Sequence, residues 1–242
     1  GIAGYGLNGV FATNARDVLR VNNNTFNNNY YPVTANYTVA PSSTNTMSIA
    51  QNTINTTNVN GVREGVTFNS ALSFTPTANN MRIAANTFSN VTIGVKVTAT
   101  SIGLRISNNT FTIHPTATNP KGIYMAGSNT VTVDNNIIYG SLTSTNVAAY
   151  SVNHHGILSE NSPGCKVQCN TISNVGIGVE YRGGNTSSGA GFFNNTLNYP
   201  IRRGLFLTNG GIIGTQGSSS GASANQWLGS WPAPATADPN KT

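Results

Sequence analysis

The chain has 242 residues, of which 38% are hydrophobic and only 7% are charged, and its formal net charge is +6. This length and apolar content suffice for one large core in a single domain. The Lys and Arg residues are scattered singly except at Arg202 and Arg203. This scatter argues against nucleic acid as a partner, because nucleic-acid binding needs a clustered basic surface. No apolar run is long enough to insert into a membrane as a helix.

A short pattern, apolar-x-apolar-x-small-Asn-Thr-(Phe/Ile), recurs along the chain. Its spacing is too irregular for a coiled coil but suits stacked coils whose strands are constant and whose loops vary. Around Asn86, for example, the apolar members are Met81, Ile83 and Phe88. The alternation of a strand therefore breaks at the asparagine and then resumes, which predicts a corner between two strands. The asparagines that occupy this position are Asn24, Asn52, Asn86, Asn109, Asn136, Asn170 and Asn195.

Asparagine suits such a corner for two reasons. It tolerates the left-handed backbone conformation that a tight corner needs, and its side-chain amide can hydrogen-bond to the equivalent amides in the coils above and below. We therefore expect an internal ladder of hydrogen-bonded asparagines.

Each coil is expected to open with another strand, in which a glycine precedes an apolar residue. The glycines of this column are Gly9, Gly65, Gly94, Gly122, Gly156, Gly178 and Gly204. In the second coil, Tyr37-Thr38-Val39 is expected to replace the glycine-led strand. Three short strands per coil, joined by corners, predict an all-β fold: a right-handed parallel β-helix solenoid of about seven to eight coils.

We expect residues 1–231 to form this single domain, with 209–231 as its C-terminal cover and 232–242 as a Pro/Ala-rich linker or tail. Because Gly1 already lies in solenoid-like sequence, the chain is expected to be a segment of a longer secreted protein. Cys165 and Cys169 lie on one expected strand with their Cα atoms about 13 Å apart, which is beyond the reach of a disulfide. Both are therefore expected to be small buried apolar side chains.

The glycine-led strands are expected to present their outward side chains in two columns. The column two residues after each glycine is Thr67, Lys96, Tyr124, Leu158, Glu180 and Phe206. The column four residues after it is Asn69, Thr98, Ala126, Glu160, Arg182 and Thr208. Glu160 and Arg182 should therefore be neighbours on successive coils, with Glu180 diagonal to Glu160.

This arrangement allows two interpretations. In the first, Glu160, Glu180 and Arg182 are catalytic candidates, with the two glutamates as acid and base of an inverting glycosidase. The ligand-binding candidates are then Lys96, Tyr124, His154 and His155, with Tyr124 as a platform for a sugar ring. In the second, Glu160 and Arg182 form a surface salt bridge that contributes under about 1 kcal/mol. The other acids occur singly, so neither a metal nor a cofactor is expected.

From about Gly9 to Trp227 the coils resemble the pectate-lyase-like superfamily of right-handed β-helices. The later half is similar to the β-helix modules of large cell-surface proteins exported by type IX-secreting bacteria. The runs that carry this likeness include Gly156-Ile-Leu-Ser-Glu-Asn-Ser-Pro-Gly-Cys, Gly176-Ile-Gly-Val-Glu-Tyr and Asn225-Gln-Trp-Leu-Gly. The resemblance implies secretion and surface display rather than a particular reaction. Members of the superfamily that cut pectin use clustered Asp residues, or calcium-binding acids with an Arg, and no position here reproduces either cluster.

The sequence thus predicts a non-catalytic extracellular module that serves as a rigid stalk, as an adhesive face for polysaccharide or another cell-surface component, or as both. The first alternative is a polysaccharide hydrolase or lyase. It requires a groove walled by residues 112–121 and 141–153, with both glutamates exposed in it. The second alternative is a self-associating fibre segment, which requires matching exposed ends so that like chains or adjoining domains stack end to end.

Overall fold

The computed structural model of the chain describes residues 8–14, 18–37, 46–56, 64–73, 81–101, 103–114, 117–143, 153–184, 190–198, 203–214, 216 and 223–229. All regular structure in these ranges is β-strand. The strands form three parallel sheets whose neighbouring strands are almost always three apart in the chain, so each passage of the chain adds one strand to each sheet. The predicted all-β class is confirmed, and the three parallel sheets fit a parallel β-helix.

Within the described ranges, the first sheet contains β1 (Asn8–Thr13), β4 (Tyr31–Tyr37), β7 (Glu64–Ser73), β10 (Ile93–Ser101), β13 (Lys121–Ala126), β16 (His155–Glu160), β19 (Ile177–Arg182) and β22 (Arg203–Thr208). The second contains β2 (Val18–Asn22), β5 (Thr46–Ala50), β8 (Met81–Ala84), β11 (Arg105–Ser107), β14 (Thr132–Asp134), β17 (Lys166–Gln168) and β20 (Gly191–Phe193). The third contains β3 (Thr25–Asn27), β6 (Thr53–Asn55), β9 (Thr87–Val91), β12 (Thr110–Ile113), β15 (Ile137–Tyr139), β18 (Thr171–Ser173), β21 (Thr196–Asn198) and β23 (Gln226–Leu228).

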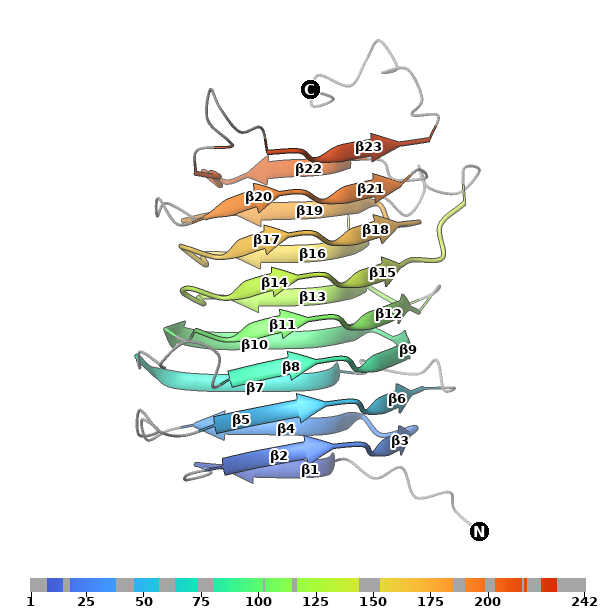
Figure 1. The fold of residues 1–242 in the computed structure, drawn as a ribbon, viewed down its shortest axis with the longest axis vertical. Helices are drawn as coiled ribbons and strands as arrows, with labels where there is room; N and C mark the ends of the chain where they lie inside the picture. The colour runs from blue at the N-terminus through green and yellow to red at the C-terminus, as the bar shows by residue number, and fades with distance from the viewer. Residues whose placement is uncertain are drawn as a thin grey trace.

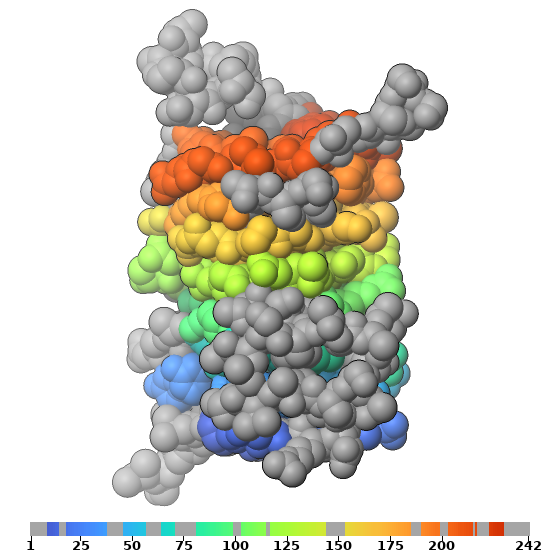
Figure 2. Space-filling view, turned by 90° about the vertical axis from the view of Figure 1, so that its left-hand side faces the viewer, coloured from blue at the N-terminus to red at the C-terminus, as the bar shows by residue number. Residues whose placement is uncertain are grey.

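The strands of each sheet stack along the long axis of the molecule, with β1 near one end and β23 near the other (Figure 1). In Figure 2 the coloured coils form successive bands in chain order along the same axis. Each coil therefore contacts mainly the coil before it and the coil after it.

The core consists of apolar columns that run from coil to coil inside the three sheets. One column, from the second sheet, is Ile49, Ile83, Ile106, Val133, Val167 and Phe192. Another, from the third sheet, is Ile54, Phe88, Phe111, Ile138, Ile172 and Leu197. Every member is at most 1% exposed, and burial of each such side chain contributes about 1.5–3 kcal/mol.

The glycines that open most strands of the first sheet are required by the apolar column of the third. A Cβ atom on Gly94 would lie 2.3 Å from Cδ1 of Phe111 and 2.6 Å from the carbonyl oxygen of Gly122. At Gly65 the added atom would lie 2.6 Å from Cδ1 of Phe88. No side chain fits between the sheet and these rings, which explains the glycine column seen in the sequence.

The second coil departs from the prediction. Because Val10 pairs with Val33, the position of Gly9 is taken by Pro32 in the next coil. The strand there, β4, ends at Tyr37 rather than opening at it, so the prediction from Tyr37-Thr38-Val39 is wrong. Residues 38 and 39 lie outside the described residues.

The corner between the second and third sheets is made by the residue that precedes each asparagine of the repeat. These residues have φ between 47° and 60°, and they are Asn23, Gln51, Ala85, Asn108, Asn135, Cys169, Asn194 and Ala224. The expectation that the repeat asparagine itself adopts the left-handed conformation is therefore wrong. The left-handed residue turns the chain, so that the asparagine after it directs its side chain into the solenoid. At Gln51 and Ala85 this conformation costs about 1–2 kcal/mol per residue.

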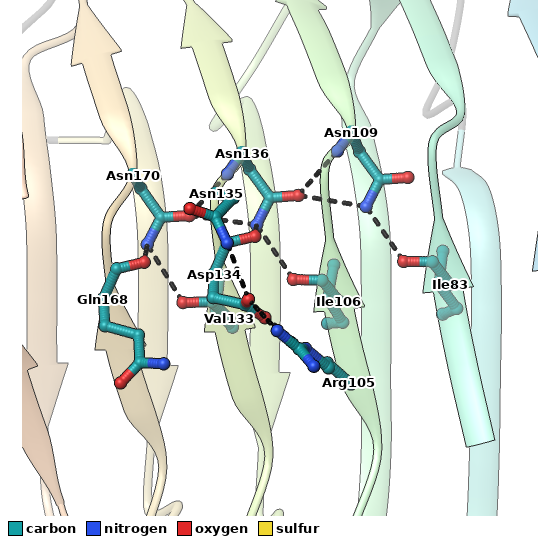
Figure 3. A network of polar contacts seen from close by, with 10 residues as sticks. All are labelled: Ile83, Arg105, Ile106, Asn109, Val133, Asp134, Asn135, Asn136, Gln168 and Asn170. Carbon is teal, nitrogen blue, oxygen red and sulfur yellow. Dashed lines mark hydrogen bonds and ion pairs between the residues drawn. The ribbon is translucent and has the colours of Figure 1, made fainter. Parts of the chain in front are cut away.

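The repeat asparagines hydrogen-bond from coil to coil (Figure 3). The side-chain Nδ2 of Asn109 donates to Oδ1 of Asn136 at 3.0 Å and to the carbonyl oxygen of Ile83 at 2.9 Å. The same pattern links Asn136 to Asn170, with an Nδ2 to Oδ1 distance of 2.9 Å. Equivalent side-chain bonds join the other repeat asparagines, which are Asn24, Asn52, Asn86 and Asn195.

The asparagine row extends one coil further than the sequence analysis proposed. Nδ2 of Asn195 donates to Oδ1 of Asn225 at 3.1 Å, and β23 pairs in parallel with β21. Trp227 occupies the inward column of the third sheet but is 48% exposed, because β23 is the last strand of that sheet in the described part. Residues 217–222 and 230–242, including Trp231 and the expected tail, lie outside the described residues.

The two cysteines occupy different environments, and both are free. Cys165 is buried in the core, where its Sγ donates to the carbonyl oxygen of Ser128 at 3.3 Å. Cys169 is exposed, because it is one of the left-handed corner residues. The prediction of a buried apolar cysteine is therefore confirmed for Cys165 and wrong for Cys169.

Candidate functional site

The outward face of the first sheet carries the two predicted columns in the predicted register. Lys96 pairs with Tyr124, Tyr124 with Leu158, and Leu158 with Glu180. In the neighbouring column Glu160 pairs with Arg182. The spacing of the glycine column therefore correctly predicted both the strands and the outward side chains that are neighbours on successive coils.

Around Glu180 the columns bring together a network of charged and polar groups. We call it the Glu180 cluster, and its members are Tyr124, His155, Glu160, Glu180, Arg182 and Thr208. All come from β13, β16, β19 and β22, four successive strands of the first sheet. This network includes three catalytic candidates and two ligand-binding candidates of the sequence analysis.

Glu180 is at the centre of this cluster, and its side chain is only 1% exposed. Its Oε1 accepts hydrogen bonds from Nε of Arg182 at 2.8 Å and from Oγ1 of Thr208 at 2.6 Å. Its Oε2 lies 2.7 Å from Nε2 of His155 and accepts from Nη2 of Arg182 at 3.1 Å. Burial alone raises the pKa of the Glu180 carboxyl, but the hydrogen bonds from His155, Arg182 and Thr208 outweigh it and lower the pKa to about 2. Glu180 is therefore a buried, ionised carboxylate with both oxygens engaged.

Glu160 is more accessible, with its side chain 28% exposed, but it is also engaged. Its Oε2 accepts a hydrogen bond from the Tyr124 hydroxyl at 2.7 Å, and its Oε1 lies 3.6 Å from Nη1 of Arg182. Burial and the bond to Glu160 raise the pKa of Tyr124 to about 12, so the hydroxyl stays protonated and continues to donate. The predicted contact between Glu160 and Arg182 is therefore present, and Arg182 bridges the two glutamates.

The two neighbouring histidines differ in their surroundings. His155 is bound to Glu180 through Nε2, whereas its Nδ1 has no hydrogen-bond partner within the described part of the chain. His154 is 2% exposed, and neither of its ring nitrogens has a hydrogen-bond partner there. Burial, with a smaller contribution from His155, lowers the pKa of His154 to about 4. His154 is thus a buried neutral imidazole near pH 7.

A second feature of the same sheet face lies four coils nearer the N-terminal end. It is a depression of about 330 Å³, which we call the Glu64 groove, and it is lined by Phe11, Tyr31, Thr34, Glu64, Thr67, Asn69 and Lys96. Lys96, one of the predicted ligand-binding residues, lies here with its Nζ 2.7 Å from Oε1 of Glu64. Phe11, Tyr31 and Glu64 were not among the ligand-binding residues predicted from the sequence. Phe11 could have been found, because it stands two residues after Gly9 and so belongs to the first outward column.

The second sheet holds a further ion pair that the sequence analysis did not identify. Nε of Arg105 donates to Oδ1 of Asp134 at 2.9 Å, and Nη2 donates to Oδ2 at 2.5 Å (Figure 3). Asn135 also donates to Oδ2 of Asp134, at 2.9 Å. The hydrogen bond to Asp134 raises the pKa of Arg105, although partial burial opposes the shift. Asp134 is thus a buried structural acid on a different face from the Glu180 cluster.

A metal centre needs clustered ligands, and a membrane-spanning helix needs a long apolar segment. Among the described residues, no group of three or more His, Cys, Asp or Glu side chains is placed to hold a metal ion. The same residues include no helix with the length and apolar character needed to cross a membrane.

Comparison with known proteins adds no family assignment: no family model, no curated protein and no solved structure matches this chain.

Proposed function

We propose that the chain is a right-handed parallel β-helix of about seven to eight coils with an internal asparagine ladder, and that it acts as a non-catalytic extracellular module. In this proposal the rod serves as a stalk, and the outward face of its first sheet adheres to polysaccharide or another cell-surface component. Its placement outside the cell rests on the resemblance of the later coils to surface-displayed β-helix modules.

One observation carries the non-catalytic part of the proposal. All the acidic side chains of the described residues are paired with a cationic side chain: Glu64 with Lys96, Asp134 with Arg105, and Glu160 and Glu180 with Arg182. A glycosidase of the inverting type needs one carboxylic acid and one carboxylate that both reach the substrate. Glu180 is buried and ionised, so it supplies neither a proton nor an accessible base.

The stalk part of the proposal is supported by the asparagine bonds and the continuous core. Each buried amide oxygen in the row from Asn52 to Asn195 accepts from the backbone N and the Nδ2 of the asparagine one coil earlier. Satisfied buried networks of this kind hold neighbouring elements in one register. A rod held in this way presents its faces at fixed positions.

A polysaccharide hydrolase or lyase at the Glu180 cluster remains the second candidate. It is favoured by the 2.7 Å contact between Nε2 of His155 and Oε2 of Glu180, because a carboxylate commonly orients a histidine that acts as acid or base. A fibre-forming segment is the third candidate, and it is favoured by the half-exposed Trp227 in the inward column.

The deciding experiment measures binding and product release on a panel of neutral and acidic polysaccharides. The purified chain is compared with Glu160→Gln and Glu180→Gln variants, whose folding is checked by circular dichroism. We expect binding without released products for all three proteins. Product release that disappears in either variant would reject the proposal in favour of the enzyme. Assembly into filaments without binding to any polysaccharide would favour the fibre segment.

A further inference from the structure

The Glu64 groove crosses the first four strands of the first sheet, which are adjacent layers of the stack in Figure 1. Phe11, Thr34, Thr67 and Lys96 lie on β1, β4, β7 and β10 and pair in register from one strand to the next. At the spacing of parallel strands, this column is about 14 Å long. The lining also extends along the strands, from Glu64 to Asn69 on β7, which is about 16 Å at the rise of a strand.

The floor of the groove is polar and held in place. Lys96 donates to Oε1 of Glu64 and Thr67 donates to Oε2, each at 2.7 Å. Beside them, Nδ2 of Asn69 donates to Oδ1 of Asn36 at 2.7 Å. Glu64 and Thr67 are each only 6% exposed, so their positions are fixed before any ligand arrives. Such pre-organised groups lower the entropic cost of binding.

The groove also carries exposed aromatic rings. Phe11 is 58% exposed and Tyr31 is 37% exposed, and both line the depression. Aromatic rings beside a few fixed polar groups are the usual composition of a small-ligand site. A sugar ring matches this combination, because its C–H faces pack on aromatic rings while its hydroxyl groups point to the sides.

We propose that the Glu64 groove binds an uncharged saccharide chain. The inference rests on the proposed function, because it assigns a location and a ligand class to the adhesive face. The ligand is uncharged because Glu64 and Lys96 neutralise each other within the floor, so the groove offers no net charge to a uronate or another acidic sugar. Hydroxyl groups need no such charge and can bond to the partly exposed side chains of Lys96 and Asn69.

A peptide ligand fits the groove less well. Extended peptides gain most of their affinity by adding a strand to a free sheet edge. Here β4, β7 and β10 are each paired on both sides, so these strands offer no edge to extend. In the described part only β1 has an open edge beside the groove, and a strand added there would extend the stack beyond Phe11 without filling the depression.

The test uses isothermal titration calorimetry of the chain with uncharged hexasaccharides of glucose, mannose and xylose, and with hexagalacturonate as the acidic probe. We expect at least one uncharged probe to bind, and Phe11→Ala and Tyr31→Ala each to weaken its Kd by about tenfold. Tyr139→Ala is the matched control, because Tyr139 is 44% exposed on β15 of the third sheet, and this variant should bind as the parent does. Unchanged thermal midpoints exclude unfolding as the cause.

A further variant tests the choice of uncharged over acidic ligands. Glu64→Gln leaves Lys96 without its counter-charge, so hexagalacturonate should bind this variant more tightly than it binds the parent chain, with a salt-dependent Kd. Hexagalacturonate that binds the parent chain more tightly than every uncharged probe would overturn the inference.

The remaining outcomes separate this inference from the proposed function. If the chain binds polysaccharide but Phe11→Ala and Tyr31→Ala leave the Kd unchanged, the groove is not the site, and the adhesive function stands with a site elsewhere. If the chain binds no polysaccharide on the panel, both the groove and polysaccharide adhesion are rejected.

Discussion

The side-chain oxygen of Asn136 accepts two hydrogen bonds from Asn109, one from its backbone N and one from its Nδ2, each at 3.0 Å. The side-chain Nδ2 of Asn136 in turn donates to the carbonyl oxygen of Ile106 at 2.9 Å. The same Nδ2 also donates to Oδ1 of Asn170 in the following coil at 2.9 Å. A single buried side chain therefore satisfies groups in the coils on both sides, and its loss leaves several buried groups without partners.

Replacement of Asn136 by Ala should consequently destabilise the protein strongly. Each unsatisfied buried group costs about 1–3 kcal/mol, so we expect a loss of about 3–5 kcal/mol. Urea unfolding followed by circular dichroism measures this loss. Asn27→Ala, at an exposed position of β3, should change stability by less than about 0.5 kcal/mol. Equal effects of the two substitutions would contradict the role given to the asparagine row.

Glu180 should make the protein less stable in acid. Its pKa is about 2 in the folded protein against an ordinary value of 4.5, so the folded state binds the proton less readily than the unfolded state. The stabilisation is fully present above about pH 4.5 and is lost as the pH falls towards 2; it is on the order of 3 kcal/mol. Thermal unfolding of the parent and of Glu180→Gln across this range checks it. The variant should have the flatter profile between pH 4.5 and 2.

His154 should make the stability of the protein depend on pH in a higher range than Glu180 does. Its pKa is about 4 in the folded protein against an ordinary value of 6.5, because burial disfavours the imidazolium. The neutral ring is tolerated above pH 6.5, and stability falls as the pH drops from 6.5 to 4, since only the unfolded state takes up the proton readily. His154→Phe should remove the slope in this window while leaving the Glu180 window in place. A slope that persists in the variant would assign the effect to another group.

The ion pair between Arg105 and Asp134 should contribute more to stability than an ordinary surface ion pair does. Asp134 is 1% exposed, so Arg105→Ala leaves a buried carboxylate with only the Asn135 amide as a side-chain donor among the described contacts. We expect a loss of about 2 kcal/mol in urea unfolding. Arg82 offers the matched control, because it pairs with Arg105 in the same column and is exposed. Arg82→Ala should cost less than about 0.5 kcal/mol.

The two thiols should differ in reactivity. Burial raises the pKa of Cys165 to about 12, whereas Cys169 is exposed. Because the thiolate is the reactive form, a thiol reagent should modify Cys169 alone in the folded protein and both cysteines after denaturation. Mass spectrometry of the labelled peptides identifies the modified residue. Labelling of Cys165 under native conditions would show that the core opens on the time scale of the reaction.

The sequence was sufficient to predict much of the register of this fold. A glycine is needed wherever an aromatic or branched side chain of the third sheet presses on the first, as Phe111 does on Gly94. An asparagine is needed wherever the row passes through a coil. The glycine and the asparagine of a coil together set the register of the strands between them. The contact between Glu160 and Arg182 could therefore be predicted from the spacing of these residues.

Other features could not be predicted, for physical reasons. Position in a column says that a side chain points outward but not whether something covers it, so the burial of Glu180 was not visible in the pattern. The left-handed corner falls on chemically diverse residues such as Gln51, Ala85 and Cys169, because only the backbone is constrained there. The Glu64 groove combines Phe11, Tyr31 and Lys96 from three coils, and no local motif links them.

The hydrogen bonds from one asparagine of the row to the next all run in one direction, since the backbone N and the Nδ2 of each donate to the side-chain oxygen of the asparagine in the following coil. From Asn52 onward, each Nδ2 also donates back to a carbonyl oxygen of the preceding coil, as Asn109 does to Ile83. Within the described residues, the hydrogen bonds of the row join only neighbouring coils, and the strands that carry the apolar columns pair only with strands of adjacent coils. Stability in such a molecule is a sum over adjacent layers, so partial unfolding should start at an end and advance inward layer by layer. The Glu180 cluster includes Thr208 on β22, which is the last strand of the first sheet in the described part. This cluster should therefore lose its positions early when that end of the rod frays, whereas groups on the middle coils should keep theirs longest.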